Sequence, residues 1–157
     1  VADAFTRGKL EGLLRWRHAL TRADLERHAA FASRGARRIA ITGASGFLGA
    51  ALVPFLTTGG HTVRTVGRGA GSDVRWDPSR GQIAAAGLDG VDAVIHLAGS
   101  SVAERWTAAT KAEILSSRVQ GTRLISESLA RMAVKPEVLV CASGIGIYGS
   151  RGEEWLD

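Results

Sequence analysis

Residues 37–49, Arg-Arg-Ile-Ala-Ile-Thr-Gly-Ala-Ser-Gly-Phe-Leu-Gly, lead from a β-branched run through three evenly spaced glycines into an apolar helical pattern. Gly43 permits a sharp strand-to-helix turn, Gly46 lets the backbone approach a pyrophosphate, and Gly49 lets the helix pack on the strand. The phosphates would meet free N–H groups at the positive end of the helix. An ordinary glycine turn would not require a strand before it and a helix after it. The stretch therefore predicts a dinucleotide site.

Length and composition are those of one globular domain. The chain has 157 residues, of which 45% are hydrophobic and 22% are charged. No apolar run approaches the roughly 20 residues of a membrane-spanning helix, and the N-terminus lacks the apolar core of a signal peptide. We therefore expect a cytoplasmic protein with no membrane span and no metal site.

The net charge of +5 comes from one end of the chain. Residues 1–38 hold nine Lys or Arg against four Asp or Glu, whereas residues 39–157 hold eleven of each. A nucleic-acid-binding domain would be expected to carry a basic patch on its folded body as well. The charge distribution therefore argues against nucleic acid as a partner.

From residue 37 onward, segments typical of strands alternate with segments typical of helices. This alternation indicates an α/β fold with a Rossmann-like, doubly wound parallel sheet. The predicted helices are 47–56 and 107–132, and the predicted strands are 39–42, 62–66, 74–76, 93–98 and 138–142.

The first 36 residues differ from the rest because they contain no strand-like run. Leucines recur at helical spacing from Leu10, and Thr21 followed by Asp24 is typical of a capping box that opens a second helix over residues 22–31. Residues 1–36 are either a solvated helical arm or the tail of a preceding domain. We favour the second interpretation.

Two polar side chains lie inside apolar strand segments. Cys141 is the lone cysteine and stands in the run 138–142, so we expect a buried strand residue rather than a catalytic thiol. His96 lies within 93–98 and has no evident carboxylate partner in the sequence. We interpret His96 as a half-buried strand residue rather than a general base.

The end of the second predicted strand bears on the choice of cofactor. In folds that prefer NAD, an acidic residue about 20 positions beyond the glycines accepts hydrogen bonds from the ribose 2′-OH. Here the strand 62–66 ends in Gly67 and Arg68, with no carboxylate. A guanidinium can form charge-assisted bonds to a 2′-phosphate and can stack on adenine. The residues predict NADP, with NAD the less favoured cofactor and a solvated loop arginine as the alternative role for Arg68.

Four segments together carry a family resemblance: Thr-Gly-Ala-Ser-Gly-Phe-Leu-Gly (42–49), Val-Ile-His-Leu-Ala-Gly (94–99), Ser-Arg-Val-Gln-Gly-Thr (117–122) and Ser-Gly-Ile-Gly-Ile-Tyr-Gly (143–149). They resemble the extended and atypical short-chain dehydrogenase/reductase superfamily. With Trp-Asp-Pro at 76–78, the chain looks like the nucleoside-diphosphate-sugar epimerase group, which is NAD-dependent epimerase/dehydratase-like. The resemblance covers residues 37–157. It implies that they are the N-terminal, NADP-binding Rossmann portion of an epimerase-like domain.

The family pattern also implies what lies beyond the chain. Asp157 stands about where the next strand region and the sugar-binding domain should begin, so the resemblance implies a sheet truncated before the substrate domain. Some members of the group carry a START-like lipid-binding domain ahead of the epimerase-like domain. Residues 15–18 and 24–28 resemble the connection between the two.

The same resemblance implies where the cofactor would lie. Leu97, Ala98 and Gly99 would line the nicotinamide ribose and pyrophosphate, while Gly67 and Arg68 would hold the adenosine phosphate. Two residues of the long helix would also be cofactor contacts, with a solvated helix face as the alternative. The full set of expected cofactor-binding residues is Gly43, Ser45, Gly46, Phe47, Leu48, Gly67, Arg68, Leu97, Ala98, Gly99, Glu113, Arg118 and Ser143.

The catalytic residues stay unknown from the sequence. The superfamily uses a tyrosine with a lysine four positions later, but Tyr148 has Gly152 at that position. Gly144 stands where extended members place a serine, although the adjacent Ser143 could reach substrate or nicotinamide. Ser143 and Tyr148 are therefore the candidates that the sequence offers.

Two functions fit these residues. The first is an NADP(H)-dependent epimerase or oxidoreductase that acts on a small molecule, such as a nucleotide sugar, with the hydride passing to the nicotinamide and back. The second is a catalytically reduced NADPH-binding sensor or scaffold, which the missing Tyr-x-x-x-Lys favours. A lipid-handling role rests on the START-like resemblance alone.

Overall fold

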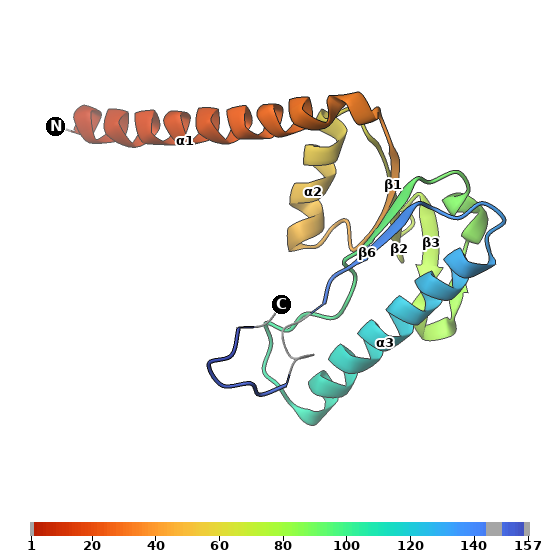
Figure 1. Cartoon of the computed structure of the whole chain (residues 1–157). Coiled ribbons are helices and arrows are strands. Elements are labelled where there is room, and N and C mark those ends of the chain that lie inside the picture. The colour runs from red at the N-terminus through yellow and green to blue at the C-terminus, as the bar shows by residue number, and fades with distance from the viewer. Residues whose placement is uncertain (1, 144–148, 156–157) are drawn as a thin grey trace.

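Strand β1 (Arg38–Thr42) lies inside a six-stranded sheet in the computed structural model, which describes residues 2–143 and 149–155. Its residues from Ile39 to Thr42 are buried, as expected for an apolar strand covered on both faces. Strands β2 (Thr62–Gly67) and β5 (Ala93–His96) pair with β1 in parallel, one on each side (Figure 1).

Three further strands complete the order β4-β3-β2-β1-β5-β6. Strand β3 (Val74–Asp77) is parallel to β2, and β6 (Val138–Cys141) is parallel to β5. The short β4 (Gln82–Ile83), which the sequence did not indicate, is antiparallel to β3. The sheet is therefore mixed but mostly parallel, and the Rossmann-like α/β fold predicted from the sequence is confirmed.

The chain changes its direction of travel across the sheet between β3 and β5. After β1 it builds β2 and β3 on one side, and it then crosses back to place β5 on the other side of β1. In doubly wound sheets, ligands bind in the crevice that such a reversal opens outside the carboxyl ends of the strands. The fold therefore places a site at the loops that follow β1 and β5.

Two helices cover the sheet, on opposite sides of it (Figure 1). Helix α2 (Phe47–Thr58) begins directly after the glycine loop and continues through Pro54. Helix α3 (Ala108–Arg131) is capped by Thr107, whose hydroxyl accepts a hydrogen bond from the backbone N–H of Thr110. Both helices begin near the carboxyl ends of the strands, where the predicted site lies.

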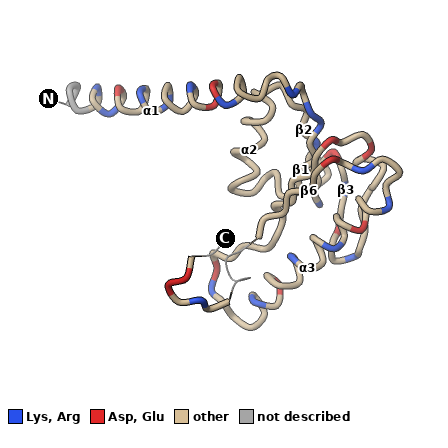
Figure 2. The backbone as a smooth tube through the Cα atoms, viewed as in Figure 1, with Lys and Arg blue, Asp and Glu red and all other residues tan. Residues whose placement is uncertain are grey.

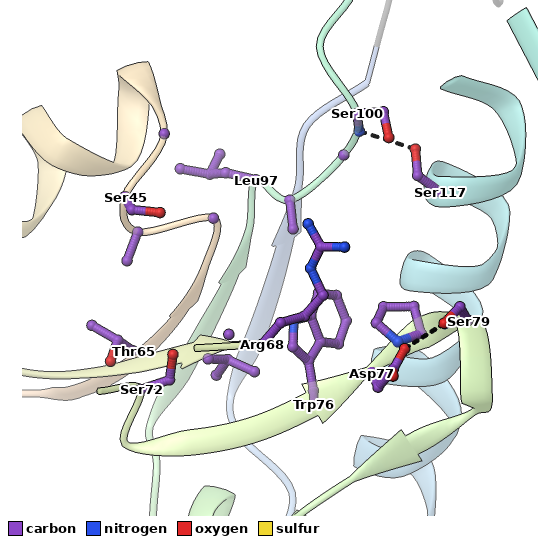
Figure 3. A pocket seen from close by; sticks show the side chains of 18 of the residues that line it. Ser45, Thr65, Arg68, Ser72, Trp76, Asp77, Ser79, Leu97, Ser100 and Ser117 are labelled. Atoms are coloured by element: carbon purple, nitrogen blue, oxygen red, sulfur yellow. Dashed lines mark hydrogen bonds between the residues drawn. The ribbon is translucent and has the colours of Figure 1, made fainter. Parts of the chain in front are cut away.

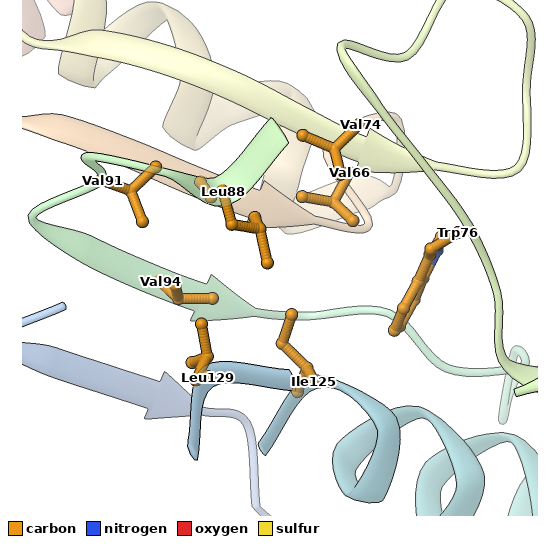
Figure 4. Close-up of a cluster of buried hydrophobic side chains, with 9 residues drawn as sticks. Val66, Val74, Trp76, Leu88, Val91, Val94, Ile125 and Leu129 are labelled. Atoms are coloured by element: carbon orange, nitrogen blue, oxygen red, sulfur yellow. The ribbon is translucent and has the colours of Figure 1, made fainter. Parts of the chain in front are cut away.

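The main hydrophobic core lies between α3 and the sheet, and Figure 4 shows Ile125 and Leu129 of α3 facing Val94 of β5. Short 3-10 turns at Pro78–Arg80 and Ala85–Leu88 add to this layer, and the second turn supplies the buried Leu88. Burial of a large apolar side chain contributes about 1.5–3 kcal/mol, so this layer anchors α3 beside the site. The buried cluster consists of Ala40, Val66, Val74, Trp76, Leu88, Val91, Val94, Ile125 and Leu129.

A long N-terminal helix extends away from the sheet (Figure 1). Helix α1 (Ala2–Phe31) is continuous and leads into a 3-10 turn at Ala32–Arg34, so the prediction of a second helix that starts at Arg22 is wrong. The segment 13–30 contains neither glycine nor proline, and the helix therefore runs through Thr21. Basic and acidic residues are interspersed along α1, with more basic than acidic ones (Figure 2). Among the described residues, no helix has the length and apolar character needed to cross a bilayer.

Two other predictions are corrected. Cys141 is exposed rather than buried, because β6 is an edge strand of the described sheet and its Val138 and Val140 are also about half exposed. The strand predicted over 93–98 ends at His96, after which the backbone turns toward the glycine loop.

Candidate functional site

The loop between β1 and α2 has glycines where no side chain fits. Gly43 adopts φ +72°, and a Cβ there would lie 2.9 Å from the Ala98 nitrogen and the Leu97 carbonyl carbon. A Cβ on the buried Gly49 would lie 2.6 Å from the Ala44 Cα. The backbone of the loop therefore packs directly against the backbone that follows β5, and the sequence prediction for these glycines agrees with their geometry.

Gly46 caps helix α2 with its backbone. Its N–H donates to the Gly43 carbonyl over 2.9 Å, and its own carbonyl accepts from the Ala50 N–H over 2.8 Å. No side chain of the described residues forms a capping hydrogen bond at the start of α2. The N–H groups at the positive end of the helix therefore keep their capacity for an anion.

The turn after β5 is held from inside the sheet by Thr42. The Thr42 hydroxyl oxygen lies 3.2 Å from the Leu97 nitrogen and 3.1 Å from the Ala98 nitrogen, and it is completely buried. The same oxygen lies 2.7 Å from Nδ1 of His96. The carboxyl ends of β1 and β5 are therefore joined by side-chain hydrogen bonds beneath the predicted cofactor site.

His96 is more deeply buried than the sequence indicated. Its exposed fraction is 3%, and its ring packs in a T-shaped arrangement against Trp76 with the centroids 5.7 Å apart. Burial lowers the pKa of His96 below its ordinary value of 6.5. The prediction of a half-buried residue is therefore corrected to a buried one, and the partner that sequence reasoning missed is a threonine 54 positions earlier.

The end of β2 brings Arg68 to the same place. The exposed side chain of Arg68 points toward the middle of the surrounding lining residues (Figure 3). The following loop carries a carboxylate, Asp73, but it accepts hydrogen bonds of 2.7 Å from the backbone and hydroxyl of Thr65, which hold its pKa below 3.8. Asp73 is not among the described residues that line the cavity, so at this strand end the cavity receives a guanidinium instead of a carboxylate.

The opposite side of the cavity is a side-chain network between the loop after β5 and helix α3. The Ser100 hydroxyl donates to Glu113 Oε1, and the Ser100 backbone N–H donates to the hydroxyl of Ser117, both over 3.0 Å. Arg118 Nη1 donates to the Ser100 carbonyl over 3.0 Å and to the Ile114 carbonyl over 3.2 Å. Ser100 is therefore held at its N–H, hydroxyl and carbonyl groups.

The end of β3 contributes a part of the cavity that the sequence identified only as a family motif. Trp76, Asp77, Pro78 and Ser79 all line the cavity (Figure 3). Asp77 accepts hydrogen bonds from the Ser79 hydroxyl at 2.6 Å and from its backbone N–H at 3.1 Å, and they hold the pKa of Asp77 below 3.8. The sequence could have predicted that these residues line the cavity, because they lie at the end of a predicted parallel strand and parallel strands end at the same edge of the sheet.

Nine of the thirteen predicted cofactor residues line one cavity of about 920 Å³, which is of the size that binds small molecules and cofactors. The lining residues that the prediction missed come mainly from α2, from β2 and the loop after it, from the end of β3 and from α3. The nine are Gly43, Ser45, Gly46, Gly67, Arg68, Leu97, Ala98, Gly99 and Glu113.

Four predicted cofactor residues lie outside this lining. Phe47 is 95% exposed and Leu48 is 60% exposed at the start of α2. Arg118 donates a hydrogen bond to the Ser100 carbonyl but is not among the lining residues, and Ser143 is exposed after β6. The second catalytic candidate, Tyr148, lies outside the described residues, so its place relative to the cavity stays a prediction.

This arrangement fits a dinucleotide. The helix start has N–H groups suited to a pyrophosphate, the glycine loop has no Cβ in the way, and the Arg68 guanidinium, which is suited to a phosphate, lines the cavity at the end of β2. The carboxylates among the described lining residues, Asp77 and Glu113, are already bonded to serine hydroxyls.

Sequence comparison finds relatives over most of the chain. The model of the NAD dependent epimerase/dehydratase family matches residues 39–156. The epimerase family protein YfhF of Bacillus subtilis (strain 168) is 40% identical over 123 residues, which make up 74% of this chain and 40% of that protein. The chain spans about 40% of the length of the first curated relatives that it matches.

Solved structures show the same similarity. A nucleoside-diphosphate sugar epimerase from Corynebacterium glutamicum superimposes with a TM-score of 0.66 at 34% identity, over 84% of this chain and 28% of that one. The human epimerase family protein SDR39U1, solved with NADPH, gives 0.60 at 30% identity, over 69% and 37%. MoeE5, solved with UDP-glucuronic acid and NAD, gives 0.59 at 29% identity, over 73% and 39%.

Proposed function

The chain belongs to the NAD dependent epimerase/dehydratase family, and from this we propose that it binds NADP(H) as the cofactor portion of an epimerase or oxidoreductase acting on a nucleotide sugar or a related substrate. The observation that carries the proposal is a single cavity lined by the glycine loop, by Arg68 and by the turn at 97–99. These are the groups that a phosphate-rich dinucleotide needs, and they follow three adjacent strands of the sheet, β2, β1 and β5.

The preference for NADP over NAD is supported by the end of β2. Arg68 lines the cavity there, while the nearby carboxylate of Asp73 is bonded to Thr65 and does not line it. A 2′-phosphate would gain charge-assisted hydrogen bonds from a guanidinium, whereas the ribose 2′-OH of NAD prefers a carboxylate acceptor. The human relative was solved with NADPH and MoeE5 with NAD, so both cofactors occur among similar proteins.

Each part of the site has its own role in the proposed reaction. A cofactor held by these residues would supply reversible hydride exchange with a substrate carbon. The N–H groups at the start of α2 would bind the pyrophosphate. Thr42 holds the turn at 97–98 against Gly43, and that turn would orient the ribose. The network around Ser100 and Glu113 fixes the other side of the cavity.

The substrate class rests on similar proteins rather than on side chains of this chain. The Corynebacterium structure is named as a nucleoside-diphosphate sugar epimerase, and MoeE5 was solved with UDP-glucuronic acid. A nucleotide sugar is therefore the first substrate class to test.

Cofactor choice is tested by the substitution Arg68→Asp. Loss of a charge-assisted bond to phosphate costs about 1.5–3 kcal/mol, so NADPH affinity should fall by roughly 10- to 100-fold while NADH affinity changes by less than about threefold. Arg75→Asp is the matched control, because Arg75 is exposed on neighbouring β3 and does not line the cavity. Unchanged NADPH affinity in Arg68→Asp would overturn the assignment.

The reaction is tested separately with the longest available form of the protein. Nicotinamide absorbance is followed with a panel of nucleotide sugars, and epimerised products are measured by chromatography, because an epimerase can return the hydride within one cycle. Turnover supports the epimerase or oxidoreductase proposal. Tight NADPH binding without turnover of any member of the panel would contradict it and favour the sensor or scaffold.

We further propose that the cofactor portion corresponds to residues 37–157 and that residues 1–36 are a separate arm. The match to the family model begins at residue 39. The ring of His28 stacks on Phe55 of α2 with the centroids 4.3 Å apart, whereas the side chains of residues 6–23 are exposed. Removal of residues 1–20 should therefore leave NADPH affinity unchanged, as measured by fluorescence titration.

A further inference from the structure

Thr42 and His96 form a buried, hydrogen-bonded pair, and their contacts restrict which atoms can carry a proton. The exposed fractions are 0% for Thr42 and 3% for His96, and Thr42 Oγ1 lies 2.7 Å from His96 Nδ1. The same Oγ1 is 3.2 Å from the Leu97 nitrogen and 3.1 Å from the Ala98 nitrogen. One hydroxyl group therefore has three neighbours within hydrogen-bond distance.

The number of protons decides which atom donates in each of these contacts. A hydroxyl has one hydrogen and two lone pairs, and a backbone N–H can only donate. The Ala98 N–H takes one lone pair of Thr42 Oγ1, and the Leu97 N–H is shared between Oγ1 and the Thr42 backbone carbonyl, at 3.2 Å from each. Among the described residues, Nδ1 of His96 is the one acceptor within hydrogen-bond distance of the buried hydroxyl. The hydroxyl hydrogen is then directed at Nδ1 of His96, which must be unprotonated in order to accept it. A neutral histidine with an acceptor at Nδ1 carries its proton on Nε2.

We propose that His96 is a positioning residue whose neutral, Nε2-protonated imidazole orients the Thr42 hydroxyl toward the cofactor-facing turn at 97–98. A proton on Nδ1 would compete with these N–H groups for Oγ1 and would leave the buried hydroxyl hydrogen without an acceptor among the described residues, so neither the other tautomer nor the cation fits this arrangement. The proposal rests on the proposed function insofar as it concerns NADPH, but the tautomer itself does not depend on any ligand.

The turn that His96 orients touches the glycine loop. A Cβ on Gly43 would lie 2.9 Å from the Ala98 nitrogen and 3.1 Å from its Cα, so the two backbone segments are in direct contact. Both segments line the cavity. A small rotation of the turn would therefore move the glycine loop or open a gap against it, and either change would displace the surface on which the cofactor lies.

The surroundings of the imidazole are neutral in the described part of the chain. The ring packs in a T-shaped arrangement against Trp76 of β3, and a Cβ on Gly121 of α3 would lie 3.4 Å from its Cε1. Burial, rather than any neighbouring charge, lowers the pKa of His96. The uncharged state that the hydrogen bonds require is therefore also the state that burial favours.

The first experiment reads the tautomer directly. Multiple-bond ¹H–¹⁵N spectra of the ligand-free protein distinguish a protonated ring nitrogen from an unprotonated one at each of the four histidines, and the His96→Asn variant assigns the His96 signals by their loss. We expect an unprotonated Nδ1 and a protonated Nε2 at neutral pH. A protonated Nδ1 would overturn the proposal whether or not the protein binds NADPH.

The second experiment separates the acceptor from the bulk of the side chain. His96→Leu removes the acceptor, whereas Asn keeps one at the position of Nδ1. NADPH should bind about tenfold more weakly to His96→Leu and within about threefold of wild type to His96→Asn. Hydrogen exchange at the Leu97 and Ala98 amides should accelerate in the Leu variant and recover in the Asn variant. Equal effects of the two substitutions would contradict the proposal.

A coupling measurement and a control complete the test. Thr42→Val should weaken NADPH binding about as much as His96→Leu does, and the double variant should be no weaker than either single variant, because both remove one network. Val94→Ala, a buried residue of the same strand without a side-chain hydrogen bond, controls for general destabilisation of β5. If wild type fails to bind NADPH, the proposed function fails, and the spectra and exchange rates still decide the role of His96.

Discussion

The two sides of the cavity are built in different ways. On one side the backbone of the glycine loop meets the backbone of the turn at 97–98, with no room for a Cβ at Gly43. On the other side Ser100, Glu113 and Ser117 reach one another through side-chain hydrogen bonds at the surface of α3. One side therefore depends on the absence of side chains and the other on their presence.

The two constructions differ in how they should tolerate change. Backbone segments in contact cannot move apart without shifting the strands that carry them, because β1 and β5 are central and paired on both sides. Side chains that are partly exposed can re-form hydrogen bonds with water when one partner is lost. We therefore expect substitutions on the glycine side to affect folding and binding together, and those on the α3 side to affect binding with little effect on folding.

The largest effect is expected for Gly49→Ala. The new Cβ would lie 2.6 Å from the Ala44 Cα and would also overlap the Gly43 carbonyl oxygen, both of which are backbone atoms. The free energy of unfolding should fall by about 3 kcal/mol or more, with loss of measurable NADPH binding. Urea unfolding and fluorescence titration measure the two effects. Gly69→Ala is the control, since nothing lies within 4 Å of a Cβ at Gly69. Equal behaviour of the two variants would remove the basis of the comparison.

A smaller effect is expected for Arg118→Ala on the α3 side. Arg118 is exposed, and its loss frees the Ser100 carbonyl to bond with water. NADPH binding should weaken by about three- to fivefold, while the free energy of unfolding stays within about 0.5 kcal/mol of wild type. Arg123→Ala, at another exposed arginine of the same helix, is the matched control. A large loss of stability would show that the side-chain network is as rigid as the glycine side.

The pH dependence of stability tests the buried His96, which lies under the turn at 97–98 on the glycine side. Because burial lowers the pKa of His96 below 6.5, the unfolded chain binds more protons than the folded one in the window between the two values. The stabilising contribution of neutral His96 is therefore complete above pH 6.5 and is lost as the pH falls through that window. Thermal unfolding between about pH 5 and pH 7.5 should show a steeper acid loss for wild type than for His96→Asn.

A separate acid loss is expected at lower pH. Hydrogen bonds from Thr65, Ser79 and Arg38, respectively, hold the pKa of Asp73, Asp77 and Asp92 below 3.8. Their contributions are present above that value and disappear as the pH falls below it.

The histidine prediction has its own contradicting outcome. Parallel curves of stability against pH for wild type and His96→Asn down to about pH 5 would contradict the role given to the buried histidine.

The smallest effect on the site is expected for Gly12→Ala in α1. Nothing lies within 4 Å of a Cβ at Gly12, and alanine favours a helix by about 1 kcal/mol over glycine. Helix content by circular dichroism should rise slightly, while NADPH affinity stays unchanged. A change in NADPH affinity would mean that helix α1 also contributes to the cavity, in addition to the glycine side and the α3 side.

Local spacing in the sequence was enough to predict the glycine side. A β-branched run, three glycines and an apolar helix start lie within 37–49, so the loop, its φ > 0 position at Gly43 and the start of α2 all follow from neighbouring residues. The place of Arg68 at a strand end was predicted for the same reason, because Arg68 directly follows a recognisable strand. Each of these features depends on steric preferences of residues that are close together in the sequence, so a local pattern is enough to predict it.

The tertiary structure alone decided the contacts that join distant segments. Thr42 meets His96 across 54 positions, and Ser100 meets Glu113 across 13, so no local pattern indicates either pair. It also decided that Cys141 is exposed at an edge strand, because strand order determines which strands are covered and sequence pattern does not. Neighbouring residues were sufficient to specify that a strand, a glycine turn and a helix suited to phosphate follow one another. Which side chains hold that turn in place depended on how the sheet brings remote strand ends together.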